Sequence, residues 1–91
     1  MSDQIIVTVS GVDNIGIVAK VTATMAQYTV NIEDIKQTIM QDNFVMIMLC
    51  NIEKMEVTFK EFKDNLLTLS NELGMEIWVQ KKDIFDKMHT I

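Results

Sequence analysis

The sequence contains no arginine: its 8 basic residues are all lysines, and 13 acidic residues bring the net charge to −5. Proteins that bind nucleic acid present a basic stripe or patch to the phosphate backbone. Arginine is also the side chain that grips phosphate through two hydrogen bonds at once. The composition therefore predicts no nucleic-acid partner and argues against phosphate chemistry.

Cysteine and histidine are almost as scarce. Cys50 is the single cysteine, so no disulfide can form within the chain. His89 is the single histidine, and no second histidine or cysteine stands beside it as a ligand. We therefore expect neither a metal site nor a cofactor.

Long apolar runs are also missing, since none approaches the ~18 residues of a membrane helix. The acidic start of the chain, residues 1–4, has neither the basic start nor the apolar stretch of a signal peptide. We expect no membrane association and a cytoplasmic location.

The chain has 91 residues, of which 48% are hydrophobic and 23% charged, a composition typical of a soluble globular domain. We expect a single domain over 1–91, with its core over 4–82 and a C-terminal extension over 83–91. Because small domains bury a smaller share of their surface, a partner subunit is a common supplement.

Hydrophobic periodicity divides the chain into six main segments. Short β-branched or alternating stretches are typical of strands, and apolar residues spaced by three and four are typical of helices. These patterns predict strands over 4–10, 31–40, 44–50 and 75–82 and helices over 15–28 and 57–73. The order βαββαβ predicts an α+β, ferredoxin-like fold: a four-stranded antiparallel sheet with both helices on one face. A short C-terminal helix can begin at Asp83.

Cap and turn signals mark the ends of these segments. Asp13 or Asn14 can cap the first helix through a side-chain oxygen. Thr58 begins a capping box at the start of the second helix. Gly74 stands where a helix commonly ends in a left-handed residue. Asp42–Asn43 tolerates positive φ and predicts a tight hairpin.

The third strand is apolar on both faces, because its seven residues are all apolar. A sheet with helices on one side should show a polar second face. Either the C-terminal tail or a second subunit covers Phe44, Met46, Met48 or their neighbours, or methionine simply tolerates exposure there. We expect a homodimer with the tail contributing, joined either edge to edge or face to face.

The segment Gly11–Gly16 closes the first strand and opens the first helix. A helix N-terminus offers free N–H groups and a partial positive charge, which stabilise a carboxylate or phosphate without a basic side chain. Two glycines at this spacing also begin a phosphate-binding loop. However, Ile17 and Val18 stand where that loop needs lysine and serine or threonine. On these residues alone, a plain strand–helix turn and an anion site both remain open.

Two motifs resemble the ACT domain family. The stretch 9–19 (VSGVDNIGIVA) looks like the family's turn from first strand to first helix, and 28–35 (YTVNIEDI) like its turn into the second strand. The resemblance spans residues 4–82. The chain looks most like the small stand-alone bacterial ACT proteins of the UPF0237 type.

This resemblance implies a pair of domains that binds an amino acid or similar small carboxylate at their interface. The contacts carried over by position are Asp13, Asn14, Ile15, Gly16, Ile17, Asn31 and Ile32. Backbone N–H groups near Gly16 and Ile17 would hold a carboxylate, and Asp13 could accept from an ammonium group. Asn31 could bridge either group. The chain departs from some amino-acid-binding members by having Gly11, Asp13 and Ile15 where they carry other residues.

Two functions follow from these observations. The first is a regulatory domain that senses a small molecule, and the second is a ligand-free module that regulates a protein partner. An enzyme is not expected: an acylphosphatase would need an arginine in the first loop, and a heavy-metal carrier would need Cys-x-x-Cys there. An RNA-binding sheet would need aromatic residues on the first and third strands.

Overall fold

The strands and helices follow one another in the predicted order. A computed structural model describes residues 3–12 and 16–88. Its elements are β1 (Gln4–Val12), α1 (Ile17–Gln27), β2 (Asn31–Met40), β3 (Asn43–Asn51), α2 (Phe59–Leu73), β4 (Glu76–Lys81) and α3 (Lys82–Met88). The α+β, ferredoxin-like fold is confirmed.

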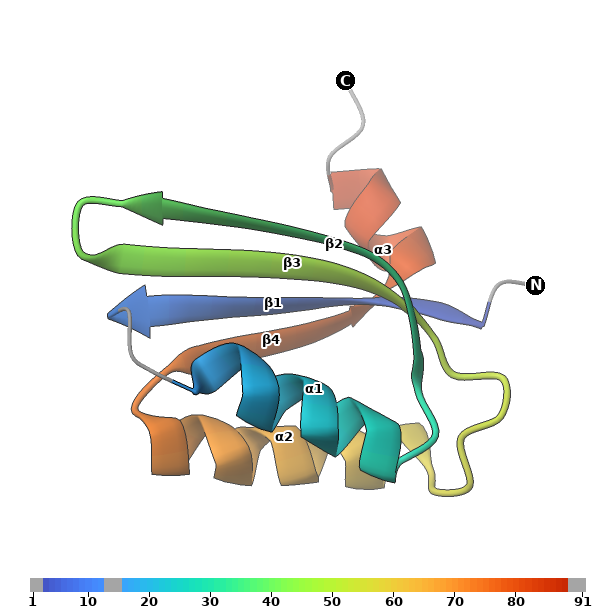
Figure 1. Cartoon of the computed structure of the whole chain (residues 1–91). Coiled ribbons are helices and arrows are strands. Elements are labelled where there is room, and N and C mark those ends of the chain that lie inside the picture. Colours follow the sequence, from blue (N-terminus) through green and yellow to red (C-terminus); the bar gives the residue numbers. More distant parts are fainter. Residues whose placement is uncertain (1–2, 13–15, 89–91) are drawn as a thin grey trace.

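The four strands of this sheet lie in the order β2-β3-β1-β4, and every neighbouring pair is antiparallel. β1 and β3 are therefore central, and β2 and β4 form the two edges. Helices α1 and α2 both lie on one face of the sheet (Figure 1). The short α3 lies on the other side, where Gln80 of β4 donates a hydrogen bond to the sulfur of Met88.

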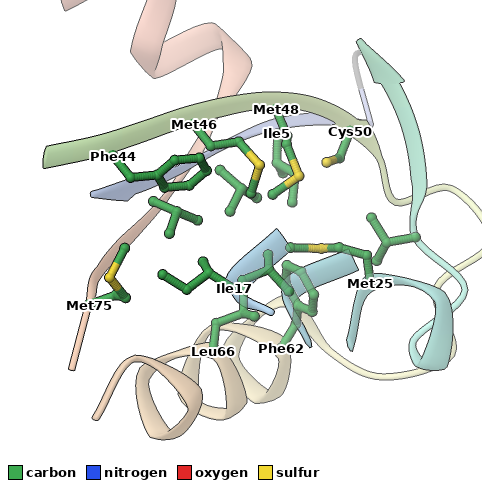
Figure 2. Packing of buried hydrophobic residues seen from close by; sticks show 14 residues of the cluster. Ile5, Ile17, Met25, Phe44, Met46, Met48, Cys50, Phe62, Leu66 and Met75 are labelled. Carbon is green, nitrogen blue, oxygen red and sulfur yellow. The ribbon is translucent and has the colours of Figure 1, made fainter. Parts of the chain in front are cut away.

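The hydrophobic core lies between the sheet and the two long helices (Figure 2). Ile5, Val7 and Val9 of β1 are completely buried, as the strand's alternation predicts. Helix α2 contributes Phe62, whose ring meets the ring of Tyr28 edge to face at 5.9 Å between centroids. The core also takes methionines from several elements: Met25, Met46, Met48 and Met75.

The two apolar faces of β3 have different surroundings. Phe44, Met46, Met48 and Cys50 point into the core, so the long helices cover them rather than the tail or a second subunit. Their neighbours point to the opposite face, where Ile47 is 39% exposed.

Both ends of α2 lie where the sequence predicts them, whereas the start of α1 differs from the prediction. The Thr58 hydroxyl accepts a hydrogen bond from the Glu61 N–H at 3.1 Å, and Gly74 has φ 65°. The N-cap of α1 is Gly16, in the left-handed region and without a side-chain cap. Asp13 and Asn14, the predicted capping residues, lie outside the described residues.

The remaining differences lie at turns and boundaries. The β2–β3 hairpin places its positive φ of 58° at Gln41, not in Asp42–Asn43, because β3 already begins at Asn43. Strand β1 continues two residues further than predicted. Helix α3 begins at Lys82, one residue before Asp83, and the Lys82 ammonium bonds the Asp86 carboxylate.

Candidate functional site

Two glycines flank the turn from β1 to α1, and each is needed for a different reason. Gly16 is exposed with φ 87°, so an L side chain would be strained there although the space around it is open. Gly11 lies within β1, and a Cβ there would come within 2.5 Å of the Met75 sulfur. Gly11 therefore serves close packing, and Gly16 sets the direction in which α1 starts.

The start of α1 offers backbone groups rather than side chains. The Lys20 N–H bonds the Gly16 carbonyl at 3.0 Å, which closes the first helical turn. The first N–H groups of any α-helix have no acceptor within that helix. Ile17 is only 2% exposed and belongs to the core, so it can serve a ligand only through its backbone. The first turn contains no acidic residue that would oppose an anion.

The predicted site residues do not all come together within one chain. Asp13, Asn14 and Ile15 lie outside the described residues. Asn31 opens β2 at the far end of the sheet, because it pairs with Asn51 and not with the β1 terminus. The whole of α1 separates Gly16 from Asn31, roughly 16 Å at 1.5 Å per residue.

Asn31 lies in a polar hollow of its own. The hollow has a volume of about 480 Å³, and its lining includes Thr29, Asn51, Glu53 and Lys54. The Asn51 side-chain oxygen accepts from the Glu53 N–H at 2.8 Å, which fixes the turn after β3. Ile32, the next predicted residue, packs against the core and pairs with Cys50.

The hollow adds residues that the sequence argument missed. Glu53 can accept from an ammonium group, and Lys54 can donate to a carboxylate, so its rim suits the two ends of an amino acid. The signal was the hairpin itself, because strands joined by a tight turn place their outer ends opposite each other. Counting back from the Met40–Asn43 pair brings this end of β3 beside Asn31, and the bulge between Ile32 and Asp34 then makes Asn51 its partner.

Thr29, in the same hollow, is held in an unfavourable conformation. It has φ 59°, and its N–H and that of Val30 close the end of α1 by bonding Ala26 and Met25. This arrangement normally places glycine at the left-handed position, where a β-branched residue is an outlier. Strain of this kind often accompanies functional sites.

Replacing Thr29 by glycine is therefore expected to stabilise the protein by about 0.5–1 kcal/mol, because relief of the left-handed strain exceeds the entropy that glycine loses on folding. Urea denaturation measures the change. Thr29→Ala is the matched control, since alanine keeps the strain. Equal stabilisation by alanine and glycine would show that the backbone conformation is not the cause.

Other kinds of site find no support in the described ranges 3–12 and 16–88. Within them, no three histidine, cysteine, aspartate or glutamate side chains gather so that they could hold a metal ion. No helix in the same ranges is long and apolar enough to cross a membrane.

Comparison with known proteins agrees with the fold and the motifs. A family model described as ACT domain matches residues 3–80. A UPF0237 protein of Methanococcus maripaludis is 48% identical over 89 residues, covering 98% of this chain and 99% of that protein. A UPF0237 protein of Listeria innocua is 41% identical over 86 residues, covering 94% and 97%.

A solved structure gives the same result. The ACT domain protein from Streptococcus pneumoniae superimposes with a TM-score of 0.81 at 29% identity, covering 94% of this chain and 97% of that one. Similar proteins thus occur in archaea as well as bacteria. The chain therefore belongs to the ACT domain family, among its small stand-alone UPF0237 proteins.

Proposed function

We propose that this chain, as a single ACT domain over 1–91, is a cytoplasmic regulatory homodimer that binds an amino acid or similar small carboxylate without catalysing a reaction. ACT domains commonly bind small ligands. The observation that carries the proposal is the placement of two chemically complementary groups of residues, around Gly16 and around Asn31, at opposite ends of α1 and beside the unpaired edge of β2.

The bare edge is β2, a ten-residue strand that pairs only with β3 in this sheet. Ile35 and Ile39 lie opposite Met48 and Phe44 and therefore share the helix side of the sheet. They are nevertheless 36% and 57% exposed. A long edge with exposed apolar side chains is a ready surface for another strand.

Pairing two β2 edges about a two-fold axis would bring the Gly16 turn of one subunit close to the Asn31 hollow of the other. The two strands would run antiparallel, so the Asn31 end of one would meet the Met40 end of the other. Met40 pairs with Asn43, and Asn43 pairs with Val12, the last residue before the turn to α1. The hollow around Asn31 would then face the Gly16 turn of the partner subunit.

The chemistry of the two halves suits a zwitterion. Backbone N–H groups at the start of α1 favour a carboxylate through their dipoles. Glu53 in the hollow favours an ammonium group, and Asn31 can donate or accept. The proposed site would hold a carboxylate without arginine, which the chain lacks.

Amino acids are expected to raise the melting temperature. A ligand at 100 times its dissociation constant stabilises the native state by about 2.7 kcal/mol. A thermal-shift series with the standard amino acids at millimolar concentration tests this. Asn31→Ala should abolish the shift, whereas Asn65→Ala, which changes an exposed asparagine of α2, should keep it. If no amino acid raises the melting temperature, the result would favour the alternative function, a regulatory module that binds a protein partner and no small ligand.

Dimerisation through β2 is tested separately by Ile39→Lys. Because a two-fold interface contains the substitution twice, the dimer dissociation constant should rise about 100-fold. Analytical ultracentrifugation measures the change. Leu67→Lys is the matched control, since Leu67 is 58% exposed on α2, away from β2. A monomeric wild type, or an Ile39→Lys protein that dimerises normally, would contradict the proposed interface.

A further inference from the structure

The second edge of the sheet carries a groove that the proposed ligand site does not use. Its volume is about 780 Å³, and it follows β4, which pairs only with β1 in this sheet. Helix α2 forms one wall with Lys63 and Leu67, and Phe85 of α3 contributes to the other. Figure 1 shows β4 at the edge of the sheet, with α2 along it.

The groove is apolar on both sides of this edge. Ile77 and Val79 lie opposite Val9 and Val7 and so share the helix side. Leu67, on that side, is 58% exposed. On the other side Trp78 is 54% exposed and pairs with Thr8. An extended chain beside β4 would find an apolar contact for the side chains of each of its faces.

Two lysines lie at the groove: Lys63 lines it together with Asp64, and Lys81 is the last residue of β4. The ammonium groups of Lys63 and Lys81 lie 5.5 Å and 5.1 Å from the centre of the Phe59 ring. Lys60, by contrast, bonds Asp64 at 2.9 Å, and Lys82 bonds Asp86. Lys63 and Lys81 thus lie beside an aromatic ring, whereas Lys60 and Lys82 are each paired with a carboxylate. In a chain of net charge −5, the ammonium groups of Lys63 and Lys81 form a local site for an acidic group.

We propose that β4 accepts an extended segment of a partner protein as a further strand of the sheet. Backbone groups of the segment would pair with the free edge, as in other cases of strand addition. Its alternate side chains would contact Leu67 on one side and Trp78 with Phe85 on the other. An acidic residue of the segment would lie near Lys63 and Lys81.

A second copy of this chain fits the groove less well. If two copies pair through β2, a further symmetric contact through β4 would keep adding copies and build an open polymer. This step rests on the proposed β2 pairing. In an antiparallel pair of β4 strands, Glu76 of one copy would lie near Lys81 of the other, so the open polymer, and not the lysines, disfavours a second copy.

The test uses a defined peptide, Glu-Asp-Val-Ile-Val-Ile-Asp-Glu, acetylated and amidated, added to the ¹⁵N-labelled full chain. Its acidic ends suit either strand direction. Amide signals of 76–81 and 63–67 should shift, while those of 31–40 stay in place. A peptide with lysine at the four acidic positions should bind about tenfold more weakly. N-methylation of alternate peptide bonds should abolish binding, since it removes the N–H donors.

Variants separate this site from the proposed dimer. Trp78→Ala and Leu67→Ala should each weaken peptide binding about tenfold, and Ile39→Lys, on the other edge, should not change it. Lys63→Gln combined with Lys81→Gln should remove the preference for the acidic peptide. Shifts at 31–40, equal affinity for both peptides, no binding at millimolar peptide, or β4 signals that already move with protein concentration would each overturn the proposal. A failure of dimerisation at β2 would leave the expected peptide result unchanged.

Discussion

Truncation of Phe62 to alanine is expected to destabilise the protein by about 3–5 kcal/mol. The ring is completely buried, and it joins α2 to the sheet and to Tyr28 at the end of α1. Removing it leaves a cavity between the two helices and the strands. Domains of this size have a total stability of about 5–15 kcal/mol, so the variant should be close to unfolding. Thermal and urea denaturation measure the loss.

Phe59→Ala provides the control within the same helix. Phe59 is only partly buried, and its ring faces the ammonium groups of Lys63 and Lys81. Its truncation should cost about 1 kcal/mol, because it removes exposed cation–π contacts and partial burial. Similar losses for the two variants would contradict the placement of Phe62 in the core.

The Cys50 thiol is expected to react with Ellman's reagent at least ~1,000-fold more slowly in the folded protein than in urea, because it is exposed only when the structure opens. The side chain is completely buried at the core face of β3. Burial, and to a lesser degree the nearby Glu33 carboxylate, raises the pKa of the thiol to about 12. Ile47→Cys in a Cys50→Ala background is the control, since position 47 is 39% exposed, and it should react quickly. Fast labelling of native Cys50 would contradict its burial.

The same raised pKa predicts how stability depends on pH. Below pH 9, the ordinary pKa, the thiol keeps its proton in both the folded and the unfolded state. Between pH 9 and about 12 only the unfolded state ionises, so stability should fall by about 1.4 kcal/mol per pH unit. Cys50→Ala should lack this contribution. The difference between the two denaturation profiles isolates it from the lysines and tyrosine.

The fold was predictable because local signals and long-range pattern agree. The alternation in β1 and the stripe of α2 each identify the buried face, and the Thr58 and Gly74 signals fix both ends of α2. The start of α1 was not predictable in the same way. The sequence predicts a helix from residue 15, but α1 begins at Ile17 after left-handed Gly16.

The site was predictable in its residue types and not in its arrangement. Gly16 and Asn31 stand out in the motifs, but the motifs do not state that α1 separates them. Asn51 and Glu53 depend on the register of β2 against β3. A bulge between Ile32 and Asp34 shifts that register by one residue, and a bulge of this kind has no clear sequence signal. The β4 groove is assembled by tertiary packing alone.

The position of Gly16 and Asn31 at opposite ends of α1 has a genetic consequence for the proposed dimer. Each of its two sites would take Gly16 from one subunit and Asn31 from the other. A chain damaged at Gly16 and a chain damaged at Asn31 would each form inactive homodimers. In a mixed dimer both lesions would fall in the same site and leave the other site whole. Two null alleles of this protein would then complement each other, and the restored function would belong to the pair of chains rather than to either one.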